Sequence, residues 1–271
     1  MWDVGCGMWD LYWPVSILHS SVNYYFWKMK PFCLFLVFIA FGYSCIREQK
    51  SDSFTIHGSF SNSGGEKIVL CEMDVKEVIS LDSARIGKDG KVNFSHQLDQ
   101  PGFYLLMFPF GRRVVLVMKR GEDLFITGDL RDTAGALNLS GSEGSQLLED
   151  FSHATMKNKA RIDSLKRVLR NHEGSEDLLR YCMIADSVFF RISKDQKKLE
   201  MEFIDKNPQS LASLIVLNYS FGPTPVLTME EDLPYYQKLT SLYRIYPKNK
   251  HVLFHLARVR LFMNNLKNPV N

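Results

Sequence analysis

The chain has 271 residues and a formal net charge of +3 at pH 7, with 33 basic residues against 30 acidic ones. So small and evenly spread a positive excess excludes the basic footprint of a nucleic-acid-binding protein. The five Cys, at positions 6, 33, 45, 71 and 182, form no C-x-x-C pair, which excludes a thioredoxin-type redox motif and a zinc-knuckle spacing.

Residues 1–28 differ in composition from everything that follows. All four Trp of the chain lie in this segment, at positions 2, 9, 13 and 27. A secretory signal has its positive residue directly before its apolar stretch, and Met29-Lys30 provides this without residues 1–28. We therefore expect residues 1–28 to be a non-native extension and translation to begin at Met29. An unusually long positive region is the alternative.

Residues 29–44 have the pattern of a signal peptide. The apolar run over residues 31–41 is about half as long as a membrane-spanning helix, which is typical of a removable signal. Gly42 and Ser44 are small residues just before Cys45, as a signal peptidase requires. The pattern resembles bacterial lipoprotein signals, which implies cleavage after Ser44 and a lipid on Cys45, although the commonest such signal has Leu in place of Gly42. A simple secretory signal that happens to precede a Cys is the alternative.

A folded region is expected to begin after a polar tether over residues 45–53. From residue 54, apolar and polar residues alternate in short runs between turn residues, which predicts strands. The expected strands are residues 54–60, 67–71, 78–86, 92–98, 103–108, 112–119 and 123–127. Asp89-Gly90 is a strong hairpin signal between two of them, and Arg120-Gly121-Glu122 is expected to join a further pair. Strands at about ten-residue spacing predict an antiparallel β-sandwich over residues 54–140.

The period changes at Ser140, which has capping-box spacing to Glu143. Apolar residues then recur at helical spacing, and we expect a helical subdomain over residues 141–271, hence an α+β protein. The first helix should extend to Asn171. The second should begin at Ser175 and end at Lys206, with Leu179, Met183 and Ile192 among its apolar positions.

Three shorter helices are expected after Lys206. Asn207 should cap the first, with Pro208 in its first turn, and residues 211–217 are apolar enough to be buried. Residues 221–227 contain Gly and two Pro and should form a loop. Thr228 to Glu231 is a second capping box opening a helix to about residue 246, and residues 251–266 should form the last helix.

The turns and core positions resemble a particular N-terminal domain of unknown function. The matching motifs are Phe54-Thr-Ile-His-Gly58, Lys67-Ile-Val-Leu70, Asp89-Gly90, Pro101-Gly102-Phe103, Gly121-Glu122 and Asn207-Pro208-Gln-Ser210. That domain precedes thioredoxin-like modules of the TlpA type in envelope lipoproteins of Gram-negative bacteria. In that family the redox reaction belongs to the C-x-x-C module, and this chain stops at Asn271, about where that module would begin. The resemblance implies an accessory half, either free-standing or left by truncation of a longer gene.

Several residues suggest chemistry but have ordinary explanations. His251 and His255 share a helix face, yet the Glu of a zinc-protease motif and a third ligand are missing from their segment. Asp82-Ser83 has no identifiable third partner for nucleophilic catalysis. The carboxylates of residues 230–232 suit the first turn of a helix. We interpret Lys194, Lys197 and Lys198 with Asp195, Glu200 and Glu202 as a solvated helix face.

The two remaining thiols, Cys71 and Cys182, lie in apolar surroundings, and we expect both to be buried rather than reactive; a bridge between them stays an alternative. The Phe-rich segments 103–110 and 221–227 are either ordinary core or exposed surface for a partner.

The sequence therefore predicts a non-enzymatic protein without a metal or cofactor, anchored to the membrane through lipid on Cys45. We expect it in the cell envelope, at the outer membrane, facing the periplasm or the exterior. The leading hypothesis is a docking domain for a thioredoxin-like redox partner. The rival is a lipoprotein that binds glycans or peptides; the absence of Trp after residue 28 counts modestly against glycans.

Overall fold

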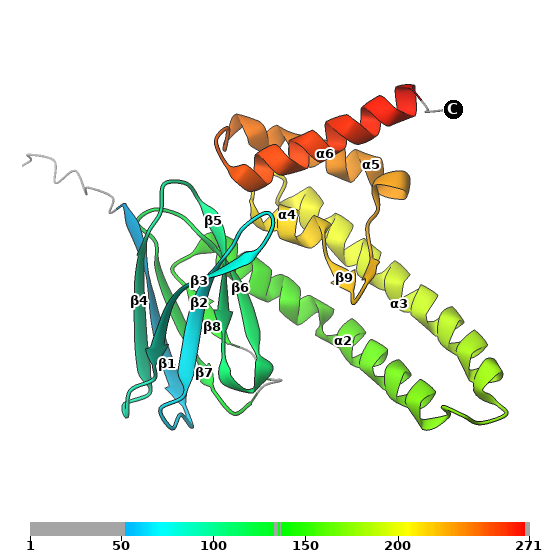
Figure 1. Cartoon of the computed structure of the whole chain (residues 1–271), viewed down its shortest axis with the longest axis horizontal. Coiled ribbons are helices and arrows are strands. Elements are labelled where there is room, and N and C mark those ends of the chain that lie inside the picture. The colour runs from blue at the N-terminus through cyan, green and yellow to red at the C-terminus, as the bar shows by residue number, and fades with distance from the viewer. Residues whose placement is uncertain (1–51, 133–134, 136, 269–271) are drawn as a thin grey trace, which may run out of the picture. The chain divides into compact units, whose positions relative to one another are not determined.

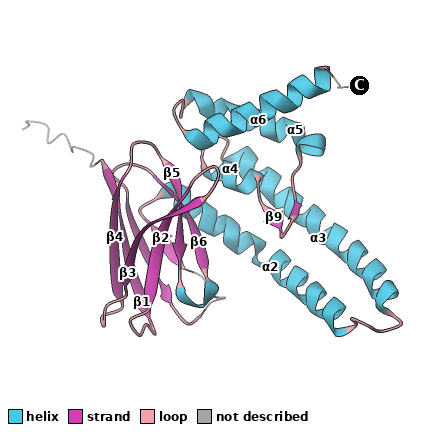
Figure 2. Cartoon of the chain, in the orientation of Figure 1, coloured by secondary structure: helices cyan, strands magenta, loops and turns pink. Residues whose placement is uncertain are grey.

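A computed structural model describes residues 52–132, 135 and 137–268. In this part of the chain strands come first and helices second, which confirms the predicted α+β class (Figures 1 and 2). Ser44 and Cys45, with the predicted signal and most of the tether, lie outside the described residues.

The strands form two sheets of four. In the first sheet the order is β4 (Lys91–Gln97), β1 (Ser53–Ser61), β7 (Asp123–Asp129), β8 (Asn138–Ser140). In the second it is β3 (Val78–Arg85), β2 (Lys67–Met73), β5 (Gly102–Met107), β6 (Arg113–Met118), with a 3-10 turn over Pro109–Gly111 between β5 and β6. Each strand predicted from alternation is present, and β8 is an additional short one.

The pairing of the strands differs from the prediction in two ways. β1 and β7 run parallel, so the first sheet is mixed rather than antiparallel. The strands flanking Asp89-Gly90, and those flanking Gly121, do not pair, because the chain changes sheets at both turns. Gly90 still makes a tight turn at φ +78°, and its carbonyl accepts from the Phe60 N–H at 2.9 Å. A turn signal specifies the reversal of the chain and leaves open which strand the chain then joins.

The core between the sheets is apolar. Alternate residues of β1, with Phe54 and Ile56 at 1% exposure, face Leu70, Leu116 and Leu124 from the other strands. β5 and β6 are buried on both faces, because their opposite side chains, including Phe103 and Val117, belong to a second core with the helices. This explains why residues 103–108 are an unbroken apolar run rather than an alternating one.

Five α-helices follow the strands in the described residues. They are α2 (Glu143–Asn171), α3 (Leu178–Lys206), α4 (Ala212–Leu217), α5 (Met229–Leu239) and α6 (Lys250–Lys267). A 3-10 turn over Thr240–Arg244 follows α5. α2 and α3 pack side by side as a long antiparallel hairpin, visible in green to yellow in Figure 1.

Three predicted helix starts are wrong. Ser140 ends β8, and the residue before α2 is Ser142, whose hydroxyl contacts the sandwich instead of capping the helix. α3 begins after Asp177 rather than at Ser175, whose hydroxyl donates to the His172 carbonyl. Asn207 ends α3 instead of starting the next helix, since its side-chain amide donates to the Phe203 carbonyl at 3.0 Å.

The helix starts at Thr228 and Asn249 are capped by their side chains. The Thr228 hydroxyl accepts from the Glu231 N–H at 3.3 Å, as predicted. The Thr228 N–H, however, donates to the Asp232 carboxylate rather than to that of Glu231. α4 is the expected buried helix. The predicted loop before Thr228 contains a short ladder, β9 (Ser220–Phe221) with β10 (Thr224–Pro225).

Candidate functional site

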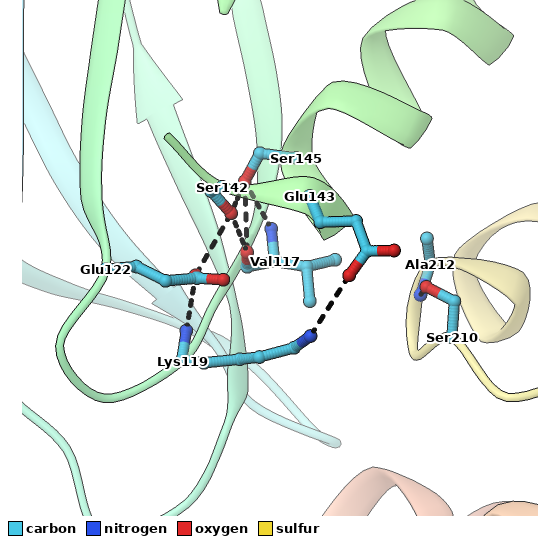
Figure 3. A network of polar contacts seen from close by, with 8 residues as sticks. All are labelled: Val117, Lys119, Glu122, Ser142, Glu143, Ser145, Ser210 and Ala212. Carbon is cyan, nitrogen blue, oxygen red and sulfur yellow. Dashed lines mark hydrogen bonds and ion pairs between the residues drawn. The ribbon is translucent and has the colours of Figure 1, made fainter. Parts of the chain in front are cut away.

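The start of α2 is joined to the edge strand β6 by two buried serines (Figure 3). The hydroxyls of Ser142 and Ser145 lie 2.8 and 3.0 Å from the Val117 carbonyl oxygen, and the Val117 N–H donates to Ser145 Oγ at 3.1 Å. Glu122 extends the network, because its carboxylate accepts from the Lys119 N–H at 2.8 Å and lies 3.0 Å from the Ser142 hydroxyl. Burial raises the pKa of Glu122.

These serines occupy the place that another strand would take beside β6. An unpaired sheet edge exposes backbone donors and acceptors, and α2 satisfies both backbone groups of Val117. Close approach depends on Gly144, where an added Cβ would lie 2.8 Å from Val117 Cβ. The helical part is therefore fixed to the sandwich at the first turn of α2.

A second connection lies where α6 begins. The Lys250 ammonium lies 2.6 Å from the Glu72 carboxylate and 2.9 Å from that of Asp74, and the Asn249 amide donates to the Pro101 carbonyl at 2.6 Å. These contacts join residues far apart in the chain. Together with the α2 junction, these contacts connect the helices to the sandwich at two places.

The α2–α3 hairpin is held together by a buried polar ladder. The Asn158 amide of α2 donates to Gln196 of α3 at 3.1 Å, and the Gln196 amide donates to Glu200 Oε1 at 3.1 Å. Glu200 is fully buried, and its second oxygen has no hydrogen-bond partner among the described residues. Burial raises the pKa of Glu200 to about 8, so the carboxyl is mostly protonated at neutral pH.

The prediction that Glu200 belongs to a solvated face is therefore wrong. Gln196 and Glu200 lie one helical turn apart on the buried side of α3. In the sequence they stand among charged Lys and Glu residues, so the pattern does not reveal that this side is buried. Lys197 also pairs inward, at 2.8 Å from Asp232 and 3.0 Å from Glu231 of α5. Asp232 is buried, so it does more than complement the helix dipole.

The opposite side of α3 carries an exposed apolar stripe. Leu179, Met183 and Phe190 are 74%, 68% and 71% exposed, although each has a large apolar side chain. Leu179 and Met183 are about one helical turn apart and Phe190 about two turns further, so all three lie on one side of the helix. We call these three residues the α3 stripe. Such a patch on a helix is typical of a surface that contacts a partner.

The α3 stripe was missed because Leu179, Met183 and Ile192 were taken together as the apolar positions of one helix, without separating its faces. A helical projection separates them, since Ala185, Ile192 and Gln196 are buried on the opposite side of α3. The signal in the sequence was that apolar residues occupy two separate sides of this helix.

The two histidines of α6 face different neighbours. His251 packs against Phe103 of β5, with ring centroids 4.6 Å apart, and His255 Nε2 donates to the Tyr236 carbonyl at 2.8 Å. Burial lowers the pKa of both, so both are neutral at pH 7. Within the described ranges, no three His, Cys, Asp or Glu side chains gather as metal ligands.

The remaining candidates lie apart from one another. Cys71 is buried in β2, which raises the pKa of its thiol, but Cys182 is half-buried on α3 rather than fully buried as predicted. Both are free thiols. Asp82 and Ser83 are exposed on β3. Of the Phe-rich segments, residues 103–108 are core, whereas Phe110 is 63% exposed at a φ of +62°.

Comparison with known families gives one match. Residues 54–148 match the model described as Domain of unknown function (DUF4369), which covers β1 to β8 and the first residues of α2. No curated protein matches the sequence. The resemblance to a domain of unknown function is thereby supported for this stretch, and the association with thioredoxin-like modules stays a prediction.

None of the helices that the structure describes is both long and apolar enough to cross a membrane.

Proposed function

We propose that the protein is a non-enzymatic, lipid-anchored protein of the cell envelope that docks a partner protein through the α3 stripe. The observation that carries this proposal is the exposure of Leu179, Met183 and Phe190 on a hairpin whose other side is locked by Asn158, Gln196 and Glu200. An apolar surface held on rigid helices loses little conformational entropy when a partner binds.

The partner that we propose is a thioredoxin-like oxidoreductase. The support is the resemblance to a domain that stands next to such modules, for which the family match covers residues 54–148. The two connections between sandwich and helices support a scaffold role, because they fix the hairpin relative to the sandwich. Lipid on Cys45 would confine the scaffold near the membrane and raise the effective concentration of a membrane-associated partner.

Changing Cys45 to Ala tests the anchor. The signal pattern predicts that this variant loses its lipid and leaves the membrane fraction, because a thioether needs the Cys sulfur. Fractionation with metabolic labelling by a clickable fatty acid measures both effects. Retention of Cys45→Ala in the membrane fraction with unchanged labelling would refute lipidation at this residue.

Changing the three stripe residues to Ser tests docking. Purification of the lipidated protein from detergent-solubilised envelopes should recover a protein with a C-x-x-C module, and the Leu179→Ser/Met183→Ser/Phe190→Ser variant should lose it. The matched control is Leu261→Ser/Leu266→Ser on α6, where the two side chains are 63% and 59% exposed. Equal recovery from all three proteins would reject the stripe as the docking surface.

The second candidate function is binding of a small polar ligand such as a glycan unit. It is favoured by one observation, a pocket whose wall includes the buried Tyr104 together with four charged side chains.

A further inference from the structure

A pocket of about 360 Å³ lies where β5 and α6 begin. Its volume is within the range of small-ligand sites in proteins. The wall is polar and apolar in about equal parts, and the side chains that decide its chemistry are Glu72, His96, Asp99, Tyr104, Lys248 and Lys250. These residues come from separate strands, loops and a helix, so the fold brings them together.

The hydroxyl of Tyr104 is a buried polar group of this wall. Tyr104 is 3% exposed, and its oxygen makes no hydrogen bond to a described residue. The oxygen lies beside Gly102, which is also part of the pocket wall, where an added Cβ would be 3.5 Å away.

Tyr104 is held in place and keeps its proton. Its ring centroid lies 4.7 Å from that of Phe54, in an edge-on arrangement, and 6.1 Å from that of His96. Burial, reinforced by the nearby Glu72 carboxylate, raises the pKa of Tyr104 to about 12. At any physiological pH the phenol of Tyr104, a residue of the pocket wall, therefore keeps its proton and can donate a hydrogen bond.

The neighbouring groups are also fixed. Lys250 is held by the carboxylates of Glu72 and Asp74, and the Asn249 amide binds the Pro101 carbonyl. Asp99, by contrast, has a fully exposed side chain, 3.6 Å from the Arg120 guanidinium. A ligand would meet Tyr104 and Lys250 already in position, which lowers the entropic cost of binding.

The charges of the wall balance. Lys248 and Lys250 stand against Glu72 and Asp99, so an anion meets two carboxylates and a cation meets two ammonium groups. A hydroxyl group can both accept from Tyr104 and donate to Glu72, whereas a charged group can do only one of the two. We propose that this pocket binds a neutral polyhydroxylated ligand, one saccharide unit in size. The site shares no residue with the α3 stripe, so either proposal can fail without the other.

Isothermal titration calorimetry on the full chain in detergent tests the site with D-glucose, D-galactose and N-acetyl-D-glucosamine. D-glucuronate and D-glucosamine serve as an anionic and a cationic version of the same ring. We expect saturable binding of at least one neutral sugar and weaker binding of both charged ones. Absence of saturable binding by all three neutral sugars, or equally tight binding of the charged ones, would overturn the proposal.

Tyr104→Phe removes the donor and keeps the ring. We expect it to weaken sugar binding at least about fivefold, because the ligand's acceptor loses its partner. Its thermal midpoint should stay unchanged, since no protein group bonds the hydroxyl. Tyr243→Phe, at a 43% exposed tyrosine outside the pocket, is the matched control.

Gln100→Trp, on the exposed wall, should abolish binding by filling the pocket. Unchanged affinity in Tyr104→Phe or in Gln100→Trp would contradict the assignment.

Discussion

The two cores of this protein are built on different principles. The core between the sheets is apolar apart from the phenol of Tyr104, with Leu70, Leu116 and Leu124 fully buried. Between α2, α3 and α5 the chain buries Asn158, Gln196, Glu200 and Asp232 in addition to the apolar residues of the second core. Apolar packing provides stability without direction, whereas hydrogen-bonded polar groups favour one register of the helices over others.

The two regions therefore differ in what they contribute to stability and in their role. Burying Glu200 with an unpartnered oxygen lowers the stability of the helical pair, and an apolar residue there would avoid that loss. What the polar ladder provides is alignment of α2 and α3, which sets the position of the α3 stripe. We therefore expect changes in the sandwich to affect stability most and changes in the hairpin to affect pH dependence and docking.

The largest effect is expected in the sandwich. Leu116→Ala should lower the free energy of unfolding by about 2 to 5 kcal/mol, because it removes transfer energy and leaves a cavity between the sheets. Urea denaturation followed by circular dichroism measures the loss. Leu253→Ala, at a 42% exposed position of α6, is the control and should change little. Equal losses in the two variants would mean that the sandwich is not the stability-determining region.

A slightly smaller effect is expected at the junction of the two regions, and the two ends of α2 provide a matched pair. Gly141 precedes α2 and Gly174 follows it, with φ values of +91° and +81°. An added Cβ at Gly141 would lie 1.8 Å from the Asp123 carbonyl oxygen, whereas nothing lies within 4 Å at Gly174. Gly141→Ala should cost about 3 kcal/mol, from strain and clash, and Gly174→Ala about 1 kcal/mol from strain alone.

Chemical denaturation of the two Gly variants compares these costs directly. If Gly174→Ala were the more damaging change, the sandwich end of α2 would not be its fixed end.

The polar ladder should make the hairpin sensitive to pH. Burial raises the pKa of Glu200 from its ordinary value of 4.5 to about 8, so the folded state holds a proton that the unfolded state releases. Stability from this group is present at low pH and is lost as pH rises from about 5 to 8. We expect a loss of about 2 kcal/mol over that interval, less than the full shift implies because buried sites relax.

Glu200→Gln should remove this loss, since Gln has nearly the shape of a protonated Glu and does not titrate. Thermal midpoints measured across the interval should fall in the parent protein. In the variant they should stay nearly level once the pH effect of the other titrating groups, which both proteins share, is subtracted. Parallel pH profiles would show that Glu200 is ionised in the folded protein. Glu202→Gln, at a 49% exposed side chain on the same helix, is the control and should follow the parent.

Local pattern in the sequence predicted the strands well. Residues 54–60 and 92–98 alternate because one side of each strand faces the core, and the structure places β1 and β4 there. The sheet to which each strand belongs was not predictable, because Asp89-Gly90 and Gly121 encode tight turns but not the partner of the next strand. The parallel pairing of β1 with β7 joins segments about 70 residues apart and has no local signal.

Residues that act through long-range contacts were the ones misjudged. Ser140 to Glu143 fits a capping box locally, but Ser142 serves the backbone of β6 instead. Glu200 stands in a charged stretch, and only the packing of α2 reveals that it is buried. Tyr104 lies in an apolar run, where no pattern separates a core residue from one that also lines a pocket.

Site-specific photo-crosslinking is the most direct test of the proposed contact between the α3 stripe and a partner in the cell. A photo-reactive amino acid at Met183 should yield, on irradiation of cells, one dominant adduct with a protein that contains a C-x-x-C module. The same probe at Leu261 of α6, exposed to a similar degree, should yield none of it. Adducts of equal yield and identity at the two positions, or none at Met183, would contradict docking through the α3 stripe.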